Sequence, residues 1–170
     1  MGSSLLLNIV IVIVGVVSAF LISSIAYSKA FKVKNRIVSV IEKYNGDCDF
    51  NNDTDTCYSE IESELRNMGY SSNITKSCPD VTISDDNNNV ASGEYVYTPK
   101  NGGYHFCVYK FTLCDEVKSD DTCKEDSNET YYYKVTTFMH FDIPLIGQVL
   151  EFPVSGETKT FYNTFINIKE

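Results

Sequence analysis

The pattern of apolar and polar residues divides the chain into a long apolar stretch, an amphipathic continuation and a mixed remainder. From Leu5 to Ile25 nearly every residue is apolar, and the first charged side chain is Lys29. About 20 consecutive apolar residues let a helix cross a bilayer, so residues 1–28 are predicted to form a transmembrane helix. Gly15 and Ala19 have a spacing of small residues that lets a second helix approach closely; the alternative is that both face lipid.

The helical pattern continues beyond this segment. Residues 29–45 are predicted to form an amphipathic continuation that ends at Asn45-Gly46. Helical i, i+3, i+4, i+7 spacing puts on one face the residues predicted to dock the helix on a soluble domain, namely Ile37, Val40, Ile41 and Tyr44. The opposite face is predicted to carry Lys32, Lys34, Arg36 and Lys43. A Lys34→Asp substitution is therefore expected to cost well under about 1 kcal/mol.

Residues 46–170 are predicted to form an extracytoplasmic α+β domain. A short helix is predicted at 56–68, and strands are predicted at 80–84, 94–98, 104–113, 130–143 and 158–168. The loop from Pro99 to Gly103 indicates a hairpin, and the other late gaps are too short for crossover helices, so the sheet should be mainly antiparallel. The predicted fold class is α+β: a long N-terminal transmembrane-plus-amphipathic helix packed on a small antiparallel β-sheet, with disulfide bonds.

Six cysteines give the domain its predicted cross-links. None has the CxxC spacing of a zinc site, and all six lie in an Asn/Asp/Ser/Thr-rich region, which favours disulfides. Fifteen pairings are possible. Loop lengths favour Cys48 with Cys57 and Cys114 with Cys123, which leaves Cys78 with Cys107.

Two features of the sequence predict opposite orientations of the membrane segment. Basic residues follow the apolar stretch closely, and the positive-inside rule alone would place the domain in the cytoplasm. Disulfides require an oxidising compartment, and we favour them as the stronger signal. We therefore expect a single-pass membrane protein with its C-terminal domain outside the cytoplasm. Cleavage after Ser28, which follows a signal-peptidase-like Ala26-Tyr27-Ser28, remains an alternative.

Charge narrows the range of partners. The chain has 14 Lys and Arg residues against 23 Asp and Glu residues, for a formal net charge of −9. The first 44 residues carry +4 and the remainder carries −13. An acidic domain argues against nucleic acid as a partner and keeps the domain away from anionic headgroups. The partner predicted from the apolar segment is membrane lipid.

Candidate catalytic and metal-binding residues are sparse. We find no nucleophile motif and no phosphate-binding loop, and we expect neither an enzyme nor a cofactor. Asp47 to Asp55 places oxygen-bearing residues at alternate positions, as calcium loops do, but Asn52 and Tyr58 stand where an EF-hand has Gly and Glu. His105 and His140 lie in predicted strands without a third ligand. We favour a solvated loop and ordinary strand histidines, hence no metal site.

Tyrosines are concentrated in the predicted strands, at Tyr95, Tyr97, Tyr104, Tyr109 and Tyr131 to Tyr133. Rows of exposed Tyr form contact surfaces in many complexes, although ordinary β packing is the simpler interpretation. A small-molecule ligand is not expected.

The order of these parts is similar to that of type IV pilins and pseudopilins. The segment YSKAFKVKNRIVSVIEKY, from Tyr27 to Tyr44, resembles the helix continuation of TadE-like proteins of Gram-positive bacteria. The run VTTFMHFDIPLIGQVLEFPVSGETKTFY, from Val135 to Tyr162, resembles the C-terminal part of that family. Pilins commonly carry a Glu near the start of the mature helix, whereas Glu42 is the first acidic residue here.

The resemblance implies a structural role. We expect a membrane-anchored minor pilin or pseudopilin-like subunit of a surface filament or secretion machine, which contacts other pilin-like subunits through its N-terminal helix. The alternative is a singly tethered cell-surface binding module whose Tyr-rich sheet holds a ligand.

Overall fold

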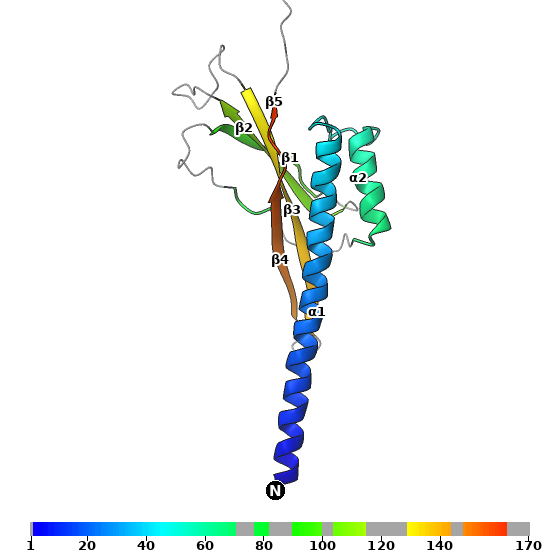
Figure 1. Ribbon diagram of the computed structural model, residues 1–170, viewed down its shortest axis with the longest axis vertical. Coiled ribbons are helices and arrows are strands. Elements are labelled where there is room, and N and C mark those ends of the chain that lie inside the picture. The colour runs from blue at the N-terminus through cyan, green and yellow to red at the C-terminus, as the bar shows by residue number, and fades with distance from the viewer. Residues whose placement is uncertain are drawn as a thin grey trace, which may run out of the picture.

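One helix forms the long axis of the molecule (Figure 1). This helix, α1, runs from Gly2 to Lys43 without interruption, and its lower part extends well beyond the rest of the chain. It ends where Asn45 and Gly46 take positive φ values of 52° and 80°, and Gly46 N donates to Ile41 O at 2.9 Å. The computed structural model describes residues 2–70, 77–81, 90–99, 104–114, 129–143 and 148–162.

The second helix, α2, runs from Thr56 to Asn67 and confirms the predicted short helix. Asp55 caps its N-terminus by accepting a hydrogen bond from Tyr58 N at 2.9 Å. Its end is followed by Gly69 at a φ of +57°. The apolar face of α2 is buried in the same core as α1, so the two helices pack as a pair.

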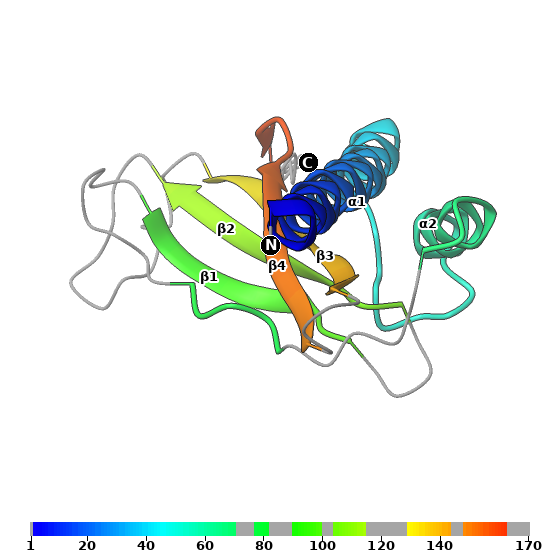
Figure 2. The same cartoon turned by 90° about the horizontal axis from the view of Figure 1, so that it is seen from below.

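The sheet has the order β1-β2-β3-β4, with neighbouring strands antiparallel, and β5 pairs with the upper part of β3. The strands are β1 (Val90–Tyr97), β2 (Phe106–Cys114), β3 (Glu129–Ile143), β4 (Gln148–Glu157) and β5 (Phe161–Tyr162). α1 packs on β3 and β4, and the view along the helix shows β1 at the far edge of the sheet (Figure 2). This arrangement confirms the predicted α+β fold.

Three strand predictions agree with the structure, and two differ from it. The predicted strands at 94–98, 104–113 and 130–143 correspond to β1, β2 and β3. The described part of the predicted strand at 80–84, Asp80 and Val81, is not a strand. Of the last predicted strand, residues 158–162 are described, and only β5 within them is a strand. Of the predicted hairpin loop, only Pro99 is described. The whole of β4 is missing from the prediction.

Two disulfides lie within the described residues. Cys48 joins Cys57 across the loop between α1 and α2, with a Cα–Cα distance of 5.2 Å. Cys78 joins Cys107 of β2, with a Cα–Cα distance of 5.9 Å. The first is a pair that loop lengths favour, and the second is the pair that remained. The other pair favoured by loop length includes Cys123, which lies outside the described residues.

Candidate functional site: the exposed apolar helix and its attachment to the sheet

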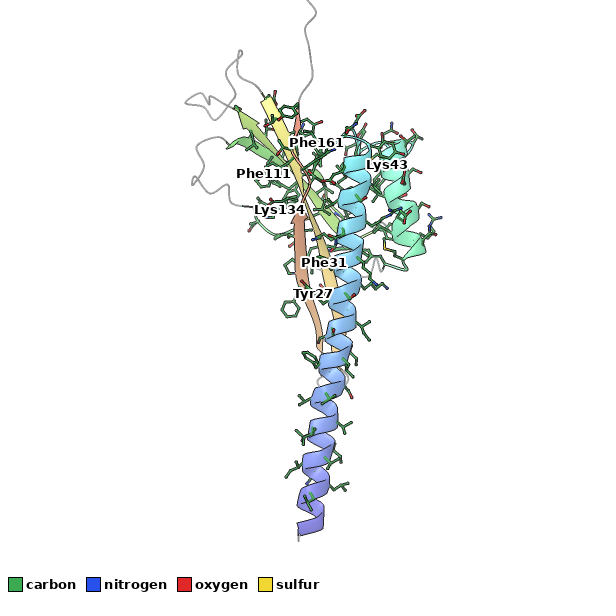
Figure 3. All side chains as sticks on the ribbon, viewed as in Figure 1. Tyr27, Phe31, Lys43, Phe111, Lys134 and Phe161 are labelled. Carbon is green, nitrogen blue, oxygen red and sulfur yellow. A yellow bond between two sulfur atoms is a disulfide. The ribbon has the colours of Figure 1, made fainter. Side chains whose placement is uncertain are left out.

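The N-terminal half of α1 exposes a continuous apolar surface. Its large side chains are 41–73% exposed, and no other described element covers them. They are Leu6, Leu7, Ile9 to Val14, Val16, Val17, Phe20 to Ile22 and Ile25. Figure 3 shows side chains pointing outward on both sides of this part of the helix. An apolar surface of this extent is unfavourable in water and marks a site of contact with lipid or protein.

Within the described residues, α1 is the one helix that is long and apolar enough to cross a membrane. The chain therefore has a single candidate membrane span near its N-terminus.

The C-terminal half of the same helix is the centre of the core. Val33, Ile37, Val40 and Ile41 are at most 2% exposed. They belong to one cluster with residues of α2 and the sheet. Ile37, Val40 and Ile41, three of the predicted docking residues, thus lie between helix and sheet. Tyr44, the fourth, packs against this cluster and donates a hydrogen bond from its hydroxyl to Glu60 at 3.0 Å.

Lys34 contradicts the predicted polar face. It was predicted to be solvated opposite the docking face, but it is only 9% exposed. Its amine lies 4.3 Å from the ring centre of Phe31, and its side chain occupies the space over Gly156 of β4. A long Lys stem can cover apolar surface while its amine stays near the edge. The prediction that Lys34 is a neutral surface position is therefore wrong.

Two other basic residues join α1 to α2. Arg36 bonds Glu64 at 2.7 Å, and Lys43 bonds Glu60 at 2.6 Å. The hydrogen bond from Arg36 lowers the pKa of the Glu64 carboxyl, and hydrogen bonds from Lys43 and Tyr44 lower the pKa of Glu60. These pairs place a polar contact along the outer edge of the helix pair.

Lys29, at the start of the amphipathic half, donates to Gly69 O just beyond α2 at 2.6 Å. Lys29, Arg36 and Lys43 thus have structural roles in fixing α1 to the domain.

The upper end of α1 is fixed by backbone contacts. Tyr133 of β3 donates from its hydroxyl to Gly46 O at 2.9 Å. A Cβ at Gly46 would lie 2.9 Å from the Phe161 ring, so only glycine fits there. Glu42 accepts a hydrogen bond from Lys159 N at 2.7 Å. Further down, Thr137 of β3 donates to Ala30 O at 3.1 Å. α1 is thus held to the sheet at both ends of its buried half.

The loop with the calcium-like pattern uses its side chains for local turns. Asp49 accepts from Asn51 N, and Asn52 accepts from Thr54 N and from the Thr54 hydroxyl. Asp55 is the cap of α2. In the described ranges no group of three or more His, Cys, Asp or Glu side chains is arranged to hold a metal. His105 packs edge-on against Phe138.

The tyrosines of the sheet are divided between its two faces. On the face away from α1, Tyr109 and Phe111 are buried; Tyr95 meets Tyr109 edge-on, and Tyr132 stacks on Phe111. Tyr70 follows α2 and is not part of the sheet, and burial raises its pKa to about 12. Its hydroxyl donates to His105 O and accepts from Phe138 N.

Near the upper end of α1 lies a polar cleft of about 890 Å³. It is lined by Tyr44 to Asp49, Lys110, Tyr131, Tyr133 and Tyr162. Tyr162 is 74% exposed, and Lys110 lies over the ring of Tyr131 at 4.6 Å. No local pattern predicts this cleft, because β5 brings Tyr162 beside a loop more than a hundred residues away in the chain.

No family model, characterised protein or solved structure matches this chain. The functional argument therefore depends on the geometry: an exposed apolar helix that is continuous with, and rigidly attached to, a disulfide-bonded domain.

Proposed function

We propose that this chain is a membrane-anchored, pilin-like structural subunit, a minor pilin or pseudopilin of a surface filament or secretion machine. The observation that carries the proposal is the continuity of α1. One helix supplies both the exposed apolar segment and the centre of the core, so the domain cannot turn independently of its anchor. A simple tether needs no such coupling, whereas lateral packing of helices between subunits does.

The proposed topology places residues 46–170 outside the cytoplasm. The two disulfides support this orientation, since such bonds persist in oxidising compartments. The basic residues after the apolar stretch do not require a cytoplasmic location to explain their presence. Lys29, Arg36 and Lys43 each bind a partner in the domain. A membrane-impermeant protease should therefore remove the domain from intact or wall-stripped cells.

Assembly is tested by photocrosslinking in the membrane. Val14 and Leu21 lie on the side of α1 opposite Ala30, which contacts β3, and both are more than half exposed. A benzoylphenylalanine at either position should give covalent adducts that contain a second copy of this chain or another helical membrane subunit. Adducts with lipid alone at both positions would refute assembly and leave only an anchor. Protection of the domain from protease, with a surface control cleaved, would refute the topology.

The second candidate function is a tethered binding module, and the polar cleft near Tyr162 favours it. Its exposed aromatic ring and the carboxylates of Asp47 and Asp49 could hold a polar ligand. Under this alternative, Tyr162→Ala should abolish binding of the polar ligand. The helix photocrosslinks to a second subunit should be absent.

A further inference from the structure

β3 and β4 run alongside α1, and two contacts show which strand residues lie level with which helix residues. Thr137 of β3 donates to Ala30 O. Two residues earlier, Val135 pairs with Gly156, and a Cβ on Gly156 would lie 2.7 Å from Lys34 Nζ. Two strand residues extend about 7 Å, and four helix residues rise about 6 Å. β3 therefore runs down and β4 runs up alongside α1 (Figure 1), and both strands are inclined to the helix (Figure 2).

β3 does not stop where the amphipathic half of α1 begins. It continues from Thr137 to Ile143, and β4 begins opposite at Gln148. This extension is about 20 Å long, which equals about 13 residues of helix. Counting back from Ala30 places the end of the β3–β4 hairpin level with about Val17. The hairpin therefore overlaps the apolar half of α1.

Small residues line the side of α1 that continues the position of Ala30 toward the N-terminus. Ala19, Ser23 and Ala26 continue the stripe of Ala30 toward the N-terminus, and all three are half-buried. Phe20, on another side of the helix, is 73% exposed. Small residues on the stripe leave room for the strands to lie close beside the helix.

The overlap has a consequence for depth. The apolar run from Leu5 to Ile25 has about the length that a bilayer core requires, so nearly all of it is needed to cross. Residues 17–25 then lie in the leaflet nearest the domain. The end of the hairpin lies at that same level.

The composition of the hairpin end suits this position. Six of its ten described residues are apolar: Met139, Phe141, Ile143, Val149, Leu150 and Phe152. His140 lies opposite Glu151 in the ladder. The other four described residues are His140, Asp142, Gln148 and Glu151.

Exposed aromatic and basic residues mark the boundary. Tyr27, Phe31 and Phe152 are 53%, 42% and 46% exposed, and Lys29 and Lys32 lie on the same stretch of helix. Figure 3 shows Tyr27 and Phe31 beside the lower part of the sheet. Aromatic rings and Lys side chains are enriched where protein passes from lipid to water.

We propose that the end of the β3–β4 hairpin, residues 139–143 and 148–152, is a second membrane-contacting element that lies in the lipid of the nearest leaflet beside α1. The inference rests on the proposed membrane anchor. It adds that the domain is seated in the bilayer surface and does not stand above it.

The chain contains no Trp, so single Trp substitutions report depth without background. The full-length chain is reconstituted in phosphatidylcholine vesicles with or without bromine on the acyl chains, and acrylamide is used as the aqueous quencher. Phe152→Trp tests the hairpin at an already exposed aromatic position, and Val149→Trp tests it deeper. Phe20→Trp reports insertion of the helix. Tyr162→Trp, exposed at the far end, is the aqueous control.

We expect brominated lipid to reduce the emission of Phe152→Trp and Val149→Trp, more strongly for Val149→Trp, and to leave Tyr162→Trp unchanged. Hairpin emission that acrylamide quenches as it does Tyr162→Trp, while lipid quenches Phe20→Trp, would overturn the inference and leave the anchor standing. Hairpin emission that neither quencher reaches would also overturn it, because protein then covers the hairpin. Loss of lipid quenching at Phe20→Trp would refute the anchor itself.

Discussion

The two halves of α1 share one backbone but have opposite surroundings. Between Leu6 and Ile25 large apolar side chains are exposed on every side. From Ala30 to Ile41 most apolar side chains face one side and are almost completely buried, whereas Phe31 is 42% exposed. The lower half has apolar residues all round, which is typical of a membrane helix. The upper half has one apolar stripe and ion pairs beside it, which is typical of a soluble core helix. The comparison shows that the pattern of apolar residues identifies the solvent of each half.

The largest expected effect distinguishes the two halves by the same substitution. Ile41→Asp places a carboxylate in a site that is 0% exposed, and we expect it to lower the free energy of unfolding by about 4 kcal/mol. Val14→Asp, in the exposed half, should leave unfolding of the domain unchanged. Chemical denaturation of the full chain in detergent, followed by near-ultraviolet circular dichroism, measures both. Equal effects would mean that the buried half does not pack as described.

The next effect concerns the end of the buried half. Gly46→Ala combines a φ of +80° with a contact of 2.9 Å to the Phe161 ring, and it should cost about 2–4 kcal/mol. Gly69→Ala is the matched control, since its φ is +57° but nothing lies within 4 Å of the added methyl group. The control should cost about 1 kcal/mol. If the two melts coincide, the contact with Phe161 has no energetic weight.

A smaller effect tests the buried lysine. Lys34→Asp removes a stem that covers Gly156 and leaves a carboxylate in its place, so we expect a loss of about 2 kcal/mol. Lys34→Met keeps the stem and should cost less. Lys32→Asp, at an exposed position, should be within about 0.5 kcal/mol of wild type. A neutral Lys34→Asp would restore the sequence-based assignment of this residue to a solvated face.

The smallest effect concerns the ion pairs at the edge of the buried half. Arg36 lowers the folded-state pKa of Glu64, and Lys43 lowers that of Glu60. The stability that these two ion pairs contribute is therefore present above the unfolded-state pKa of about 4.5, and it is lost as the pH falls through the folded-state pKa values. Melting temperatures measured from pH 7 to pH 3 should therefore fall less for Glu60→Gln/Glu64→Gln than for wild type. Arg36→Gln/Lys43→Gln should give the same flattening, with no further change when the four substitutions are combined.

The sequence was sufficient for the parts of the fold that local pattern dictates. The spacing of Ile37, Val40 and Ile41 identified the buried stripe, and Asn45-Gly46 identified the helix end. β4 was missed because Pro153 and Gly156 both disfavour strands, yet an edge strand tolerates Pro.

The candidate site depended on placement that local pattern does not contain. Lys34 was assigned to the wrong face because residue type outweighed its angular position, which is only 60° from Ile37 on the helix. The polar cleft and the overlap of the hairpin with the apolar half follow from strand pairing over long sequence distances.

Because α1 is one uninterrupted helix, the number of residues in it sets the rotation of the apolar half relative to the sheet. Each residue inserted between Ile25 and Lys29 would turn the apolar half by 100° and shift it by 1.5 Å relative to the sheet. An insertion of seven residues would restore the angle to within about 20°, but would lift the domain by about 10 Å. If the chain assembles as proposed, the number of residues in this short stretch sets which face of the sheet is turned toward the next subunit, and at what height. Length changes there should be rarer than substitutions, whatever the chemistry of the residues themselves.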